Sequence, residues 1–215
     1  MKKLVIREFS LQAQTEFERH IPEEQAELSA LADRMLSAFP YVIRAEDILL
    51  FSETKLYDYR LAFKLFNGSA DATLSSKNIA LHFRDGRTEQ ALTLVSKSID
   101  QIYKIFVNRP TLVNQLTFSA QAQFDSPEAY SEYMAQFTKA DLGYLSGGKI
   151  IQAEARNLSG ELRLLTEKSA MFENGLFLSV QFYTKEGLTS ELMEMMAKRF
   201  IEVAGYEGIE LAFPK

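Results

Sequence analysis

The fold is decided by the stretch Leu11-Gln12-Ala13-Gln14-Thr15-Glu16-Phe17, which returns near the middle of the chain as Phe118-Ser119-Ala120-Gln121-Ala122-Gln123-Phe124. In both stretches apolar or small residues alternate with polar ones, which is the pattern of a strand with one buried and one solvated face. A Pro-Glu pair follows each stretch, at Pro22 and at Pro127, and this pair is typical of the first turn of a helix. The sequence therefore predicts that a strand and a following helix occur twice.

The rest of the first half reads as several strands and a second helix. An apolar stripe from Leu28 to Phe39 predicts the first helix. Alternation then predicts strands near residues 42–51, 57–65, 70–75 and 79–84, with Asn67-Gly68 as a turn. From Thr88 to Pro110 the apolar residues return to helical spacing.

The second half repeats this order of elements. Asn174-Gly175 predicts a type I′ hairpin turn between a strand that ends at Phe172 and one that begins at Leu176. Gly187 and Thr189 then match Gly86 and Thr88 before the last helix. These shared landmarks favour an internal duplication. We expect a first repeat over residues 1–108 and a second over residues 109–215, joined as one continuous structural unit.

The predicted fold class is α+β, with two tandem β-α-β(3–4)-α repeats forming a pseudo-twofold antiparallel sheet. In topology this arrangement resembles the TATA-binding-protein fold and the helix-grip fold. The resemblance covers each half of the chain. It implies helices packed on one face of the sheet and an open or cupped opposite face, and it carries over no functional residues.

Composition excludes several classes of protein. The net charge of −5 and the pI near 5.3 disfavour nucleic-acid binding, which needs a basic surface. The chain has no cysteine, so it has no disulfide framework, no thiolate metal site and no cysteine nucleophile. Arg7 and Glu8 interrupt the N-terminal apolar run, and no run approaches the ~18 residues of a membrane span. We expect a cytoplasmic protein that does not bind membranes.

One stretch superficially matches a nucleotide-binding motif. Gly143-Tyr144-Leu145-Ser146-Gly147-Gly148-Lys149 spells GxxxxGK, but Ile150 stands where a serine or threonine would meet Mg²⁺. A phosphate loop follows a strand and opens a helix, whereas this stretch follows a helix and enters a strand. We interpret it as a connector, and we expect the chain to need no cofactor.

The titratable residues form no recognisable catalytic or metal motif. His20 and His82 are the only histidines, and neither has a partner at zinc-binding spacing. No GxSxG nucleophile elbow is present. The sequence therefore predicts no catalytic residue and no metal ligand, although it does not show whether carboxylates from distant strands face one another.

A polar sheet face is the candidate site. Gln12 and Gln14 share one parity of the first strand, and Gln121 and Gln123 share the same parity in the repeat. If the two strands lie side by side at the pseudo-twofold, these four glutamines cluster. The same face is expected to carry Arg60, His82 and Arg84. Amide side chains both donate and accept hydrogen bonds, which suits recognition better than proton transfer.

Two functions remain open at this point. The first is a non-catalytic binding or adaptor protein that uses the polar face for a protein or peptide partner, or for a second copy of the chain in a homodimer. The second is a small-molecule-binding protein or enzyme with a cavity between sheet and helices, for which Tyr57, Tyr59 and Tyr103 supply polar tips.

Overall fold

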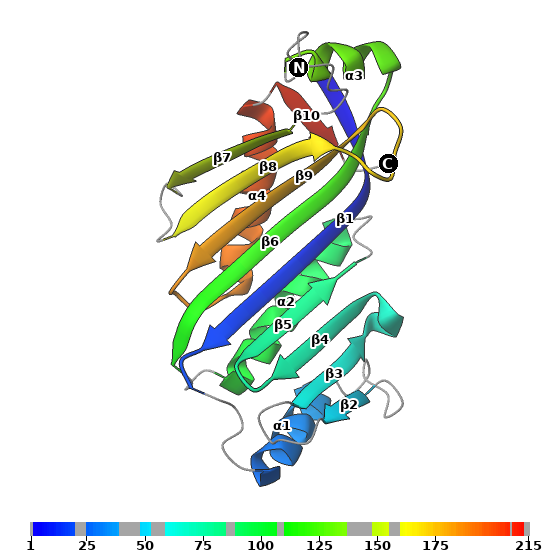
Figure 1. Cartoon of the computed structure of the whole chain (residues 1–215). Helices are drawn as coiled ribbons and strands as arrows, with labels where there is room; N and C mark the ends of the chain where they lie inside the picture. The colour runs from blue at the N-terminus through cyan, green and yellow to red at the C-terminus, as the bar shows by residue number, and fades with distance from the viewer. Residues whose placement is uncertain are drawn as a thin grey trace.

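The structure is a computed structural model that describes residues 2–19, 25–38, 48–52, 59–84, 89–106, 110–136, 148–154, 160–206 and 208–212. The chain is a mixed α+β protein built on a mainly antiparallel sheet (Figure 1). The strands are β1 (Lys2–Phe17), β2 (Ile48–Ser52), β3 (Tyr59–Leu65), β4 (Ala70–Ser75), β5 (Asn78–Phe83), β6 (Thr111–Phe124), β7 (Gly148–Glu154), β8 (Glu161–Lys168), β9 (Gly175–Thr184) and β10 (Ile209–Ala212). The described helices are α1 (Gln25–Ala38), α2 (Glu89–Phe106), α3 (Pro127–Met134) and α4 (Ser190–Tyr206), with a short 3₁₀ turn η3 (Phe66–Gly68).

The two long strands β1 and β6 form the centre of the sheet. The strand order is β2-β3-β4-β5-β1-β6-β9-β8-β7, and β10 pairs in parallel with the first residues of β1. In the antiparallel β1–β6 ladder Leu11 lies opposite Phe118. The register shifts at Arg7, which lies opposite no residue of β6. The two stretches that open the sequence analysis are therefore direct neighbours.

The helices that the structure describes cover one face of the sheet. On β1 and β6 alternate residues are buried, and the residues between them stay half-buried or exposed. Figure 1 shows α1, α2 and α4 on the same side of the sheet. Phe200 of α4 packs against Phe9 and Phe118 at ring-centroid distances of 6.2 and 6.4 Å. The core therefore lies between the sheet and these helices, and we call the opposite side of the sheet the open face.

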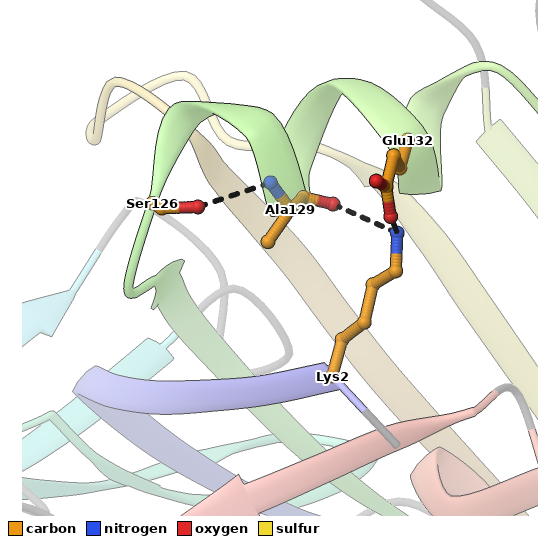
Figure 2. A network of polar contacts seen from close by, with 4 residues as sticks. All are labelled: Lys2, Ser126, Ala129 and Glu132. Carbon is orange, nitrogen blue, oxygen red and sulfur yellow. Dashed lines mark hydrogen bonds and ion pairs between the residues drawn. The ribbon is translucent and has the colours of Figure 1, made fainter.

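Helix α3 is attached to the start of β1 (Figure 2). Ser126 caps the helix by accepting a hydrogen bond from the backbone N–H of Ala129 at 3.1 Å. Lys2 donates from Nζ to the Ala129 carbonyl at 3.3 Å and to a Glu132 carboxylate oxygen at 2.6 Å. Tyr133 then packs on Phe124 of β6 at a centroid distance of 5.6 Å, which fixes the buried side of this short helix.

A buried hydrogen-bond network ties α2 to the centre of the sheet. The side chains of Thr15 on β1 and Asn114 on β6 are fully buried on the helix side. Thr15 donates to Asn114 Oδ1 and is joined to the Tyr103 hydroxyl of α2. Asn114 Nδ2 donates to the Glu186 carbonyl at 2.7 Å, just before α4. Burial raises the pKa of Tyr103, which keeps its hydroxyl protonated as a donor.

A second polar contact joins α2 to the start of α4. The Asp100 carboxylate accepts from the Ser190 backbone N–H at 2.8 Å and from its hydroxyl at 2.6 Å. Thr189 accepts from the Leu192 N–H at 3.1 Å. A carboxylate at a helix N-terminus satisfies free N–H groups and complements the helix dipole. The last helix is thereby positioned by the helix before it.

The hairpin between β8 and β9 differs from the type I′ prediction. β8 ends at Lys168 rather than at Phe172, and Asn174 has a left-handed φ of 55° whereas Gly175 does not. The Ser169 hydroxyl accepts from the backbone N–H groups of Met171 and Phe172, which folds residues 169–174 into a longer loop. A local side-chain contact therefore overrides the Asn-Gly signal.

The other predicted strand and helix patterns agree with the described elements. Buried Leu61, Phe63 and Leu65 confirm the apolar face of β3, and Ile79, Leu81 and Phe83 confirm that of β5. Several sequence interpretations lie outside the described residues: those on His20, Pro22, Tyr57, Gly86, Thr88 and the segment 143–147, and the part of the predicted 42–51 strand before Ile48.

Candidate functional site

Polar side chains cross the open face in one row. Successive cross-strand partners place one residue from each of β3, β4, β5, β1, β6, β9 and β8 at the same level of the sheet. In that order they are Lys64, Asp71, His82, Gln12, Thr117, Gln181 and Arg163. Six inter-strand spacings of about 4.8 Å make this polar row about 29 Å long.

The structure separates the four predicted glutamines into two pairs. Gln12 lies opposite Thr117 and Gln14 opposite Gln115, whereas Gln121 lies opposite Glu8 and Gln123 opposite Val5. At about 3.3 Å per residue, the level of Gln121 is about 20 Å along β6 from that of Gln115. Because β1 and β6 run antiparallel from the Leu11–Phe118 pair, equivalent residues move apart. The expected cluster of four therefore does not form.

The second pair of glutamines holds a loop over the open face. Gln121 Oε1 accepts from the Ser169 hydroxyl at 2.6 Å. Gln123 Nε2 donates to the Glu173 carbonyl at 2.9 Å and its Oε1 accepts from Arg7 Nε at 3.2 Å. These contacts fasten the loop of residues 169–174 above β6, so Gln121 and Gln123 have a structural role that the sequence did not predict.

Of the predicted basic residues, His82 and Arg84 lie together and Arg60 lies elsewhere. Arg84 donates from Nε to His82 Nδ1 at 3.3 Å and from a terminal nitrogen to Asp71 at 2.6 Å. Arg60 is exposed on β3 opposite Ser75, near the other end of the strands. The three residues therefore do not form one basic cluster.

The contacts of His82 argue against a general-base role. Its Nδ1 accepts from the permanently charged Arg84, which assigns the proton of the neutral ring to Nε2. Burial lowers the pKa of His82 below the usual 6.5, the Asp71 carboxylate raises it, and the Arg84 guanidinium lowers it. The ring is neutral at pH 7, with its one basic nitrogen already occupied.

We expect His82 to make stability depend on pH. The folded-state pKa is depressed, so as the pH falls below about 6.5 the unfolded chain binds the proton first. The stability that the folded protein gains from keeping His82 neutral is complete above about pH 6.5. It is lost as the pH falls through the lower pKa of His82 in the folded state. Urea unfolding at about pH 8 and about pH 5.5 should show wild type losing more stability on acidification than His82→Gln, which keeps an acceptor for Arg84. An equal loss in both proteins would contradict this assignment.

A depression on the open face lies beside Arg84, and small side chains form its floor. Its volume is about 190 Å³, and Ser10 and Ser119 lie on neighbouring strands within it. Ser119 donates to Ser179 of β9 at 3.0 Å, which continues the line of serines. We call Ser10, Ser119 and Ser179 the serine trough. A serine side chain is shorter than the side chains that surround these three residues. The serines therefore form the bottom of a depression.

Charged, amide and apolar groups form the walls of this trough. Glu8 and Gln121 flank the serines on one side, and Arg84 stands at the β5 end. Met171, from the loop that Gln121 holds, and Phe177 of β9 complete the depression. Sequence reasoning named Gln121 and Arg84 but missed the apolar members.

An apolar patch adjoins the trough. Ile150 of β7 and Leu165 of β8 are cross-strand partners on the open face, at the level of Ser179. Ile150 is 73% exposed and Met171 is 58% exposed. With Phe177 these residues form what we call the apolar patch: Ile150, Leu165, Met171 and Phe177. The consecutive pairs Leu164-Leu165 in β8 and Ile150-Ile151 in β7 break the alternation of their strands and were the available sequence signals.

The alternative of a cavity between sheet and helices gains no support from the tyrosines. Tyr103 uses its hydroxyl in the buried network with Thr15. Tyr57 and the side chain of Tyr59 lie outside the described residues. In the described part of the chain, no group of three or more acidic or histidine side chains is placed to hold a metal ion, and no helix is long and apolar enough to cross a membrane.

No protein-family model matches the sequence, and a search of curated proteins finds no match.

Proposed function

We propose that this chain is a non-catalytic binding protein that uses the open face of its sheet to hold a protein or peptide partner in the cytoplasm. The observation that carries the proposal is the apolar patch, which lies beside polar groups on the face that the helices leave uncovered. Exposed apolar side chains that gather beside polar ones are characteristic of interaction sites.

We further propose that the face is built by duplication, with tandem halves 1–108 and 109–215 in a TATA-binding-protein-like topology. Equivalent residues Leu11 and Phe118 are direct cross-strand partners, as a twofold axis between β1 and β6 requires. β5 and β9 flank this central pair on either side. Duplication accounts for the width of the face, because each half contributes one of the two central strands and the strands on its outer side.

The charges of the open face favour a protein partner over a nucleic acid. Its basic side chains alternate with acidic ones instead of forming a basic stripe. Among the described residues they include Arg7, Arg60, Lys64, Arg84 and Arg163, interspersed with Glu8, Glu16, Asp71, Glu161 and Glu167. A surface of mixed charge, amides and apolar groups matches the composition of protein interfaces.

The proposal is tested by selecting ligands for the immobilised full chain from a library of displayed random peptides. Binding of the selected peptides should weaken at least about tenfold in Leu165→Glu, because a charge would enter the apolar patch. Ile201→Glu is the matched control, since Ile201 is an exposed apolar residue of α4. Both variants should melt within a few degrees of wild type.

Two results would contradict the proposal. One is a library that yields no saturable ligand. The other is a set of ligands that bind Leu165→Glu as well as the control. A homodimer is the alternative form of the same proposal, and sedimentation of wild type against Leu165→Glu distinguishes it, because only a dimer through the open face dissociates in the variant.

A further inference from the structure

We propose that the serine trough binds one extended peptide segment of the partner, lying across the strands. An apolar side chain of this segment occupies the depression against Met171 and Phe177, and an acidic side chain about five residues away contacts Arg84. This inference rests on the proposed binding function and specifies the chemistry of its partner.

The depression has the size and the apolar wall for one side chain. Its volume is about 190 Å³, and a cavity of about 150 Å³ accommodates benzene. Met171 offers a flexible thioether beside the Phe177 ring, and this pairing adapts to different apolar groups. Met171 is held above the sheet through the Ser169–Gln121 hydrogen bond, so the wall is formed before a ligand arrives.

The remaining lining groups match the hydrogen-bonding groups of a peptide backbone. The Ser10 hydroxyl both donates and accepts, the Gln121 amide nitrogen donates, and the Ser119 hydroxyl, whose proton is donated to Ser179, accepts. The Glu8 carboxylate only accepts, which suits a backbone N–H. A peptide chain presents N–H and C=O groups in alternation, so donors and acceptors are both used.

Arg84 provides the charge selection. Among the described residues its guanidinium donates to His82 and Asp71, which leaves further N–H groups of the five for a ligand. The side chain of Arg84 is 62% exposed and is oriented by these two contacts. An oriented guanidinium favours a carboxylate over other partners.

The strand order sets the spacing between the two anchors. Arg84 follows β5 and Phe177 lies on β9, three strand spacings apart in the order β5-β1-β6-β9. At about 4.8 Å per spacing the anchors are about 14 Å apart across the strands, and Phe177 lies two residues, or about 7 Å, along β9 from Ser179, which is at the level of Arg84. The separation is therefore about 16 Å, which is the length of about five extended residues. The ligand should therefore carry an apolar and an acidic residue separated by about five positions.

The experiment sequences the peptides selected on the full wild-type chain and repeats the selection on variants. Peptides from wild type should be enriched in the apolar–acidic pair at the stated spacing. Arg84→Gln should lose the acidic preference and keep the apolar one. Met171→Ala and Ser119→Phe, one removing the wall and the other filling the depression, should each lose the apolar preference.

Matched controls separate this effect from general changes in the protein. Arg199→Gln removes an arginine of α4 that has an ion pair of the same length as Arg84, 2.6 Å, away from the open face. Ile201→Ala is the control for Met171→Ala. Neither control should change the selected motif. Ser119 lies on a central strand, so Ser119→Phe could prevent folding. Met171→Ala changes only an exposed loop, and it tests the same point if Ser119→Phe does not fold.

The outcomes distinguish this inference from the proposed function. Peptides that bind the open face, lose binding in Leu165→Glu and yet show no apolar–acidic pair would overturn the trough assignment alone. Selected motifs unchanged in Arg84→Gln and Met171→Ala would do the same. Absence of any ligand sensitive to Leu165→Glu would instead overturn the proposed function.

Discussion

Replacing Phe118 by alanine is expected to lower the free energy of unfolding by about 3–5 kcal/mol. The ring is fully buried at the middle of the central strand β6. It packs against Phe9 of β1 at 6.0 Å and against Phe200 of α4 at 6.4 Å between centroids. Its removal costs the transfer energy of the ring and leaves a cavity at the junction of both halves of the sheet with the last helix.

Urea unfolding at constant pH measures this loss. Phe177→Ala is the matched control, because Phe177 is a half-buried ring on the neighbouring strand β9 but faces the open side. We expect the control to lose less than half as much. Equal losses in the two variants would mean that the open face contributes to stability as the core does, and would contradict the one-sided arrangement.

Replacing Asn114 by alanine is expected to cost about 2–3 kcal/mol. The change removes the acceptor of the Thr15 hydroxyl and the donor to the Glu186 carbonyl in one step. A buried polar group left without its partner costs about 1–3 kcal/mol, well above the net value of an ordinary hydrogen bond. Tyr103→Phe removes only the outer hydroxyl of the network and should cost about 1 kcal/mol.

The control for Asn114→Ala is the next residue of the same strand. Gln115 is half-buried on the open face and donates to Thr117 at 3.0 Å. Water can replace this contact, so Gln115→Ala should change the unfolding free energy by less than about 0.5 kcal/mol. If the two alanine variants unfold at the same urea concentration, the network is not a determinant of stability.

Local patterns in the sequence predicted the elements because they report how each segment meets the core. The alternation of Leu11, Ala13 and Phe17 with glutamines identified both the strand and its buried side, and the burial of these residues confirms it. The Asn-Gly pair at residues 174–175 failed, because the Ser169 hydroxyl reorganised the loop through contacts that a dipeptide signal does not contain.

The candidate site was only partly predictable for a related reason. Gln121 and Arg84 were identified from their parity and charge, and both line the depression. Arg60 is also a positively charged residue on the open face, but it lies near the other end of β3. Parity assigns a residue to a face, whereas its position along that face depends on register.

The sequence by itself determined the α+β class, the absence of cysteine chemistry and the division of each strand into a buried and a polar side. These features depend on composition and on periods of two to four residues. Tertiary structure alone decided the pairing of β1 with β6, the separation of the glutamines, the loop that carries Met171 and the trough between Arg84 and Phe177. Strand register arises from contacts between residues more than a hundred positions apart, such as Leu11 and Phe118, and a local pattern contains no information about them.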